Sequence, residues 1–269
     1  MSNFLMITMH YFRRMFADVK EIILLLMIPI GLIIFQSVIG GEIEGIYLDG
    51  YNVLASHAAP AMLLSFQFFN SFFMFFFLYN DFRGARRWRL LAAPCPIGAF
   101  VFPAFIASWI LSIVLGLVVI VVAALFMNVY WGNLFVLAVV LAIIALMATF
   151  VAVLIFLFTK RLAQANAVGY IVSFGLMVLS GFMIPLQLFG DNAVIRFMIN
   201  YGTPLSLGTS AVISSGGLSG IFPPEMNIFF PGVGVTGGRE QVLINIGILA
   251  GITLVLGLIA VIAARRRKI

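Results

Sequence analysis

The residues with the clearest potential for chemistry lie in one short basic segment. Residues 80–96 have the sequence NDFRGARRWRLLAAPCP, in which arginines surround a small apolar group. A helix with Trp88 and two leucines among arginines suits docking into a groove on another protein. The same arginines could instead hold the segment against lipid head groups, and the residues alone leave both interpretations open. The candidate contact residues are Asp81, Arg83, Arg86, Arg87, Trp88, Arg89, Leu90 and Leu91.

Catalytic and metal-binding chemistry is sparse in the rest of the chain. The sequence contains no GxxxxGK[ST] phosphate loop, so energy from ATP would have to come from a partner protein. No apolar run carries an ionisable residue near its middle, which disfavours an ion-coupled transporter, although carbonyls of a broken helix can still bind sodium. His10 and His57 are expected on opposite membrane faces and cannot share a metal. We therefore expect no catalytic residue, no metal and no cofactor in this chain.

The composition requires that these segments be positioned by a membrane-embedded fold. Of 269 residues, 64% are hydrophobic and 9% are charged, whereas soluble domains carry roughly 25% charged residues. A soluble fold of this size cannot hide so much apolar surface, so that surface must face lipid. The net charge of +6 comes from short basic runs between apolar stretches, which is typical of membrane topology rather than of nucleic-acid binding. The single cysteine, Cys95, excludes an internal disulfide.

Apolar runs long enough to cross a bilayer occur six times. A spanning helix needs roughly 20 apolar residues. The predicted fold is therefore all-α, a polytopic membrane protein that forms a single transmembrane domain over residues 1–269. The predicted spans are residues 22–39, 58–78, 100–127, 134–158, 167–189 and 242–264.

The distribution of Lys and Arg predicts the orientation of these spans. Thirteen basic side chains fall in the N-terminal segment, the loops after the second and fourth spans and the C-terminus, against Arg196 and Arg239 on the other side. Positively charged loops stay in the cytoplasm. Both termini are therefore expected in the cytoplasm, with a multi-pass chain in a bacterial or archaeal inner membrane.

Two segments outside the spans have patterns of their own. Residues 1–21 place apolar side chains at roughly helical spacing, which predicts a helix lying on the membrane surface. The stretch 193–213 is apolar but contains Arg196, Asn200, Gly202 and Pro204. This interruption favours a broken, partly inserted hairpin over a full span, with a plain surface loop as the alternative. Residues 190–241 together form the predicted extracytoplasmic hairpin and loop.

Several of these features resemble the ABC-2 permease family, the membrane subunits of ATP-binding-cassette exporters. The resemblance is carried by Asp81, which stands where the family usually has Glu, and by the Leu-Leu-Ala-Ala-Pro segment at 90–94. It is also carried by Ser180-Gly181 with Pro185, and by Pro204 at the end of the broken hairpin. The order and spacing of these motifs agree over nearly the whole chain.

The resemblance implies a set of partners. Such subunits pair as homodimers or heterodimers in the bilayer, and each binds a cytoplasmic ABC ATPase, two copies per complex, which carries ATP and Mg. Residues 80–98 would form the coupling loop and would contact the ATPase together with the N-terminal helix. No nucleic acid is expected as a partner.

The resemblance also implies a substrate path between two permease subunits, lined mainly by the second and fifth spans. In the second span, Gln67, Asn70, Ser71 and Met74 share one helix face. We expect this face to line the path, with neighbouring phenylalanines contacting the cargo. Hydrogen bonding between helices, with the phenylalanines outward, is the alternative. The candidate path residues are Gln67, Phe68, Asn70, Ser71, Met74, Tyr170, Ser173 and Met177.

These observations favour a non-catalytic permease that exports a hydrophobic or amphipathic substrate, such as a drug, peptide, lipid or lipid-linked glycan. Two alternatives stay open on the sequence. An ion-coupled secondary transporter is disfavoured by the uncharged membrane interior. A membrane enzyme or an assembly factor for a cofactor shares the topology, but the outer carboxylates and His57 are scattered rather than clustered.

Overall fold

The computed structural model shows a bundle of long helices. It describes residues 3–41, 47–48, 51–84, 87–88, 98–180, 194, 197, 201–216 and 239–266. The predicted all-α fold is confirmed, apart from one hairpin in which β1 (Tyr47–Leu48) pairs antiparallel with β2 (Tyr51–Asn52). The helices are α1 (Asn3–Ala17), α2 (Val19–Gly41), α3 (Val53–Phe72), α4 (Met74–Phe82), α6 (Gly98–Phe126), α7 (Leu134–Phe158), α8 (Leu162–Leu179), α10 (Pro204–Ser215) and α11 (Arg239–Arg266).

Within the described chain, five helical stretches are long and apolar enough to cross a membrane. α2 is not one of the five, although its 23 residues give it a length of about 35 Å. The count of six spans therefore stays a prediction. The five stretches are Ala58–Phe82, Phe100–Phe126, Leu134–Phe158, Leu162–Leu179 and Arg239–Ala264.

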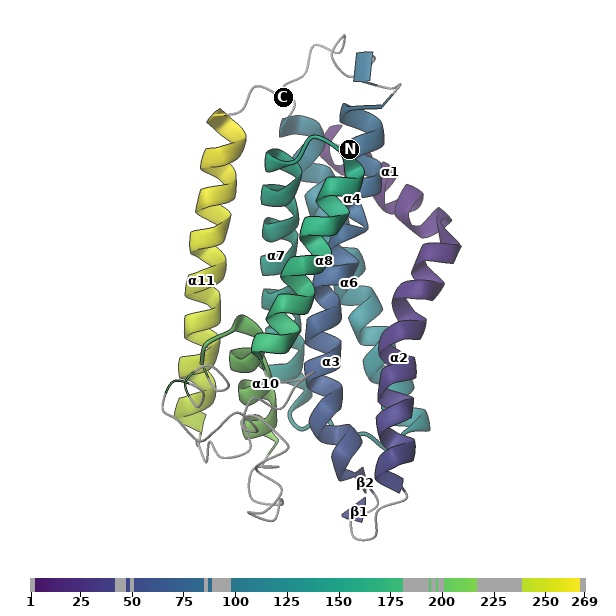
Figure 1. Cartoon of the computed structure of the whole chain (residues 1–269), viewed down its shortest axis with the longest axis vertical. Coiled ribbons are helices and arrows are strands. Elements are labelled where there is room, and N and C mark those ends of the chain that lie inside the picture. The colour runs from purple at the N-terminus through teal and green to yellow at the C-terminus, as the bar shows by residue number, and fades with distance from the viewer. Residues whose placement is uncertain are drawn as a thin grey trace.

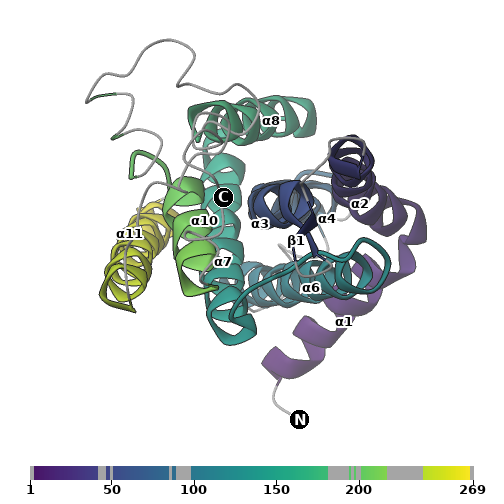
Figure 2. The same ribbon diagram turned by 90° about the horizontal axis from the view of Figure 1, so that it is seen from below.

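The span formed by α3 and α4 lies at the centre of the bundle. Seen along the helix axes, α3 lies between α2, α6, α7 and α8 (Figure 2). This span is the most enclosed of the five. It is interrupted at Phe73, where the Phe73 amide bonds to the Asn70 carbonyl. Just before this break, the Ser71 hydroxyl donates to the Gln67 carbonyl, a contact that tends to bend helices.

α1 lies at one end of the bundle, at an angle to the helices (Figure 1). Tyr11 and Met15, one helical turn apart, are buried on the side of α1 that contacts the bundle, whereas Met9 and Phe16 are exposed. The chain leaves the α-helical conformation at Asp18 before α2 begins. The turn between α7 and α8 and the C-terminal end of α11 lie at the same end, which we call the α1 end.

α10 lies at the opposite end of the bundle, packed among α3, α7 and α11 (Figure 1). Thr203 caps α10. The Ser206 amide donates to the Thr203 hydroxyl at 3.0 Å, and the Thr203 amide donates to the Ser206 hydroxyl at 3.2 Å. A Cβ on Gly208 would meet Val140 and Ile144 of α7. Those residues lie about 9 and 15 Å along α7 from its start. This half of the predicted hairpin therefore enters the bundle, while 193–200 falls largely outside the described residues.

Candidate functional site

A buried ion pair joins α1 to the end of the second span. Arg14 Nη1 donates to Asp81 Oδ2 at 2.7 Å, and the Tyr11 hydroxyl donates to the same oxygen at 3.0 Å. The Arg14 guanidinium also lies 5.1 Å from the centroid of the Phe77 ring. Burial, with the neighbouring carboxylate of Asp81, raises the pKa of the Tyr11 hydroxyl, so this phenol stays protonated and donates. The cluster therefore fixes the position of α1 against α4.

A second cluster joins the end of the same span to α7. The Arg83 guanidinium donates to the carbonyl of Thr159 and, at 3.4 Å, to that of Phe156. The Tyr79 hydroxyl bonds to Thr159, and Arg83 lies over the rings of Tyr79 and Phe156. The last carbonyls of a helix lack partners within the helix and carry partial negative charge. A cation supplied by the second span therefore stabilises the C-terminal end of α7.

The predicted coupling segment begins at these two clusters. Arg87 and Trp88 are exposed, Trp88 at 65% of its surface. Just after α4 the chain turns so tightly at Gly84 that a Cβ there would lie 2.6 Å from the Asn80 carbonyl oxygen. The other predicted contact residues, Arg86, Arg89, Leu90 and Leu91, lie outside the described residues.

A groove with a volume of about 620 Å³ runs between α2, the second span and α8. Glu21 lies at its α1 end and Leu32 at its deep end, about 17 Å further along α2. Its size suits a drug-sized ligand. The groove is lined by Asp18, Glu21, Leu24, Leu25, Ile28, Leu32, Phe66, Phe69, Phe72, Phe73, Phe76, Leu162, Asn166, Tyr170, Phe174 and Met177.

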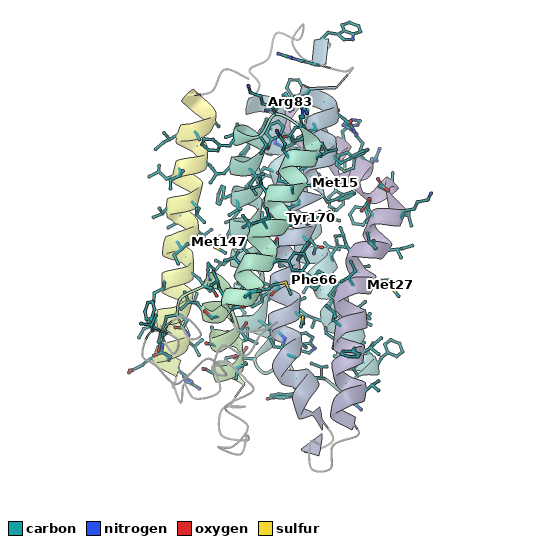
Figure 3. All side chains as sticks on the ribbon, in the orientation of Figure 1. Met15, Met27, Phe66, Arg83, Met147 and Tyr170 are labelled. Atoms are coloured by element: carbon teal, nitrogen blue, oxygen red, sulfur yellow. The ribbon has the colours of Figure 1, made fainter. Side chains whose placement is uncertain are left out.

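Aromatic side chains from two helices meet in this groove. The Phe69 ring lies 6.0 Å from the Tyr170 ring and 5.5 Å, edge to face, from the Phe174 ring. The Phe66 ring packs against Phe69 in a tilted arrangement, with centroids 5.2 Å apart. Figure 3 labels Phe66 and Tyr170 near the middle of the bundle. Tyr170 and Phe174 are each about half exposed, so they can also contact a molecule from outside this subunit.

Of the predicted path residues, Tyr170 and Met177 line the groove. The polar stripe of the second span points elsewhere: Ser71 lies 3.4 Å from the Thr149 hydroxyl of α7, and Gln67 lies beside Gly116 of α6. This placement agrees with the alternative interpretation of the second span, in which the polar face packs against neighbouring helices and the phenylalanines lie on the other face. The remaining predicted path residues are buried inside the subunit: Gln67, Phe68, Asn70, Ser71, Met74 and Ser173.

Sequence reasoning named Tyr170 and Met177 but missed most of the other residues that line the groove, and it missed the partners of Asp81. Phe66, Phe69, Phe73 and Phe76 recur at the spacing of one helix face, and this signal could have identified the groove. Arg14 was counted only as a basic residue that indicates orientation. No local pattern connects it to Asp81, because the two are 67 positions apart.

The fold and its groove define a multi-pass helical membrane protein. Residues 2–216 match the family described as ABC-2 type transporter. The match covers more than half of the chain, so the chain belongs to this family and is the permease component of an ABC transporter. No curated protein matches the sequence. The resemblance predicted from the motifs is therefore confirmed at the level of the family.

Proposed function

We propose that this permease exports a hydrophobic or amphipathic substrate from the cytoplasm, driven by a separate ABC ATPase that carries ATP and Mg. The observation that supports this most directly is the Arg14–Asp81 ion pair, which ties α1 to α4 just before that helix ends at Phe82, where the predicted coupling loop begins. In this proposal α1 and the coupling loop form one contact surface for the ATPase. Members of the family normally pair with such an ATPase.

The two polar clusters give this surface a mechanical role. A force on the loop acts first at Asp81 and Arg83, at the end of the second span. The Arg14 contact carries that force to α1, and the Arg83 contact carries it to the end of α7. Because charge-assisted hydrogen bonds are strong and directional, these helices move together rather than separately. ATP binding in the partner would thus rock the helices around the groove.

The groove is the proposed substrate path, and a second permease subunit closes it. Its α8 wall includes Tyr170, Phe174 and Met177, and the first two are about half exposed, so the groove is open to the surroundings of the subunit. An open apolar groove facing lipid would not enclose a cargo, so we propose a dimer in which two grooves face each other. The α1 end would face the cytoplasm of a bacterial or archaeal cell, because most Lys and Arg residues flank that end.

A pull-down from the native host tests the ATPase partner. The tagged permease, gently solubilised, should retain a stoichiometric ABC ATPase. Reversal of Arg86, Arg87 and Arg89 to Glu should release it, because the coupling loop then carries the wrong charge. Arg239→Glu, at the other end of the bundle, is the matched control and should retain the ATPase. An intact permease without any ATPase would reject ATP-driven export and favour an ion-coupled transporter.

A further inference from the structure

The groove is apolar along most of its length but acidic at its α1 end. Leu25, Ile28 and Leu32 of α2 face the phenylalanines of the second span across it. Asp18 and Glu21 line the same groove where α2 begins. A molecule lying along this groove would therefore meet hydrocarbon and aromatic surface over most of its length and two carboxylates at one end.

These two carboxylates have no partner in the described part of the chain. The described residues hold three carboxylates at the α1 end, and the third, Asp81, is paired with Arg14. Neither Asp18 nor Glu21 forms an ion pair or a side-chain hydrogen bond there. The nearest basic residues in sequence, Arg14 and Lys20, do not line the groove, and neither does Arg161, which precedes the groove residue Leu162. Its end therefore carries two negative charges that nothing in the described subunit neutralises.

The start of α2 explains only part of this arrangement. Acidic side chains are favourable in the first turn of a helix, and Asp18-x-x-Glu21 has the spacing of a capping box. However, neither side chain accepts a hydrogen bond from the amides of that turn within the described residues. A capping role does not require that either side chain border the groove, yet both of them line it.

The aromatic side chains that line the groove, which we call the aromatic wall, favour a cationic ligand, as the two carboxylates do. Phe69, Phe73 and Phe76 of the second span and Tyr170 of α8 line the groove. Aromatic faces attract organic cations, most strongly where water is excluded. An anionic molecule would meet repulsion at Asp18 and Glu21, and a neutral one would gain no electrostatic attraction from either carboxylate.

We infer that the groove binds cationic amphipathic molecules, with an ammonium-like or phosphonium-like head near Asp18 and Glu21 and an apolar body along the aromatic wall. This inference rests on the proposed function, because it assigns a cargo class to the proposed path. The observation that supports it most directly is the negative charge of the two unpaired carboxylates, which is complementary to a cationic head.

Binding of tetraphenylphosphonium, a lipophilic cation, to the purified full-length chain in detergent tests the inference without any ATPase. Radiolabelled probe should bind saturably to the wild type. The Asp18→Asn, Glu21→Gln double variant should weaken binding at least tenfold, because both charges that attract the cation are removed. Glu240→Gln, which removes one carboxylate at the other end of the bundle, is the matched control and should bind as the wild type does. Tetraphenylborate, the anion of similar shape, should bind better to the double variant than to the wild type.

The double variant must elute as a folded protein, and Glu21→Lys at an exposed position provides a second variant that preserves the helix. Equal affinity of all variants for tetraphenylphosphonium, or no saturable binding to a folded wild type, would overturn the inference. The inference would also be overturned if the double variant changed its oligomeric state but kept its affinity for tetraphenylphosphonium, since the groove would then be filled by a second copy of the chain. If the ATPase is captured but binding ignores the carboxylates, the cargo class is wrong and the exporter stands. If binding depends on the carboxylates but no ATPase is found, the cargo class stands and the ATP-driven exporter is wrong.

Discussion

Asp81, at the end of the second span, accepts a hydrogen bond from Arg14 of α1 at 2.7 Å and from the Tyr11 hydroxyl on the same oxygen. The side chain of Asp81 is 7% exposed and that of Arg14 is 21% exposed. A pair this well buried is costly to break, because removing one partner leaves a charge without compensation. The contact is therefore a sensitive point for both stability and coupling.

Arg14→Gln should lower the stability of the purified permease by about 2 kcal/mol, the usual loss for a hydrogen bond to a charged group. It should also reduce ATP-dependent export, because α1 loses its attachment to the second span. Arg13→Gln is the matched control, since Arg13 is exposed on the same helix turn. The apparent Tm and the rate of export by the assembled complex measure the two effects. Equal losses for Arg13 and Arg14 would show that charge alone matters.

Arg83 and Arg87 should have separable roles although they belong to the same basic segment. Arg83→Ala should lower the apparent Tm, because the last carbonyls of α7 lose their cation. Arg87→Ala should leave the apparent Tm unchanged, because Arg87 is exposed, but should weaken ATPase binding. Amide hydrogen exchange at residues 155–159 should rise only in the Arg83 variant. Increased exchange there in both variants would contradict the role given to Arg83.

Gly169 allows α8 to approach the second span closely. A Cβ at this position would lie 2.9 Å from two carbons of the Phe72 ring. Phe72 is buried and stacks on Phe75 with centroids 5.2 Å apart, so its ring has little freedom to move. Gly169→Ala should therefore cost about 1–3 kcal/mol, the usual cost of overpacking.

Gly175 provides a control on the same helix, because a Cβ there would meet nothing within 4 Å. Gly175→Ala should leave the apparent Tm of the purified permease unchanged or slightly higher. Thermal unfolding followed by intrinsic fluorescence compares the two variants. A similar Tm for both would mean that α8 does not contact the second span at Phe72.

The helices were largely predictable from the sequence, and their neighbours were not. Residues 134–158 were predicted as a span and are helical as α7 (Leu134–Phe158), because a long apolar run flanked by polar residues defines both ends. The second span was predicted to end at 78 but continues to Phe82, since Asp81 is tolerated there through its pairing with Arg14. A hydropathy pattern treats that carboxylate as the end of the apolar run.

The candidate site was harder to predict because periodicity identifies a helix face but not what that face meets. Gln67, Asn70 and Ser71 share a face, as predicted, yet that face packs against α6 and α7. The opposite face, with Phe66 and Phe69, borders the groove. Which face meets a neighbour depends on how the other helices are arranged around α3, and no pattern within the span records this.

The two faces of the second span can be distinguished by one pair of substitutions. Phe69→Ala should reduce export, because it removes a ring that contacts Tyr170 and Phe174 in the groove. Asn70→Leu should leave export nearly unchanged, because the buried Asn70 Oδ1 has no hydrogen-bond partner among the described residues and an apolar side chain of similar size removes that cost. Export by cells that carry the ATPase measures both. Loss of export only in the Asn70 variant would place the path on the polar face, as the sequence pattern first suggested.

Among the described glycines at the α10 end, Gly132, in the turn between α6 and α7, should be one of the least replaceable. Its φ is 65°, a conformation that costs ordinary residues roughly 1–2 kcal/mol. A Cβ there would also lie 2.7 Å from the Cα of Gly216, at the end of α10, and a backbone atom cannot rotate away. Gly132→Ala should thus cost about 2–5 kcal/mol in total and loosen α10 from the bundle.

The matched control for Gly132 is Gly247→Ala in α11, where a Cβ would meet nothing within 4 Å. Because alanine is the better helix former, this change should be neutral or slightly stabilising. Protease protection of residues 201–216 in purified protein, together with the apparent Tm, compares the variants. If α10 stays protected in the Gly132 variant, its packing does not depend on this turn. α10 would then be held by its contacts around Gly208 with Val140 and Ile144 of α7.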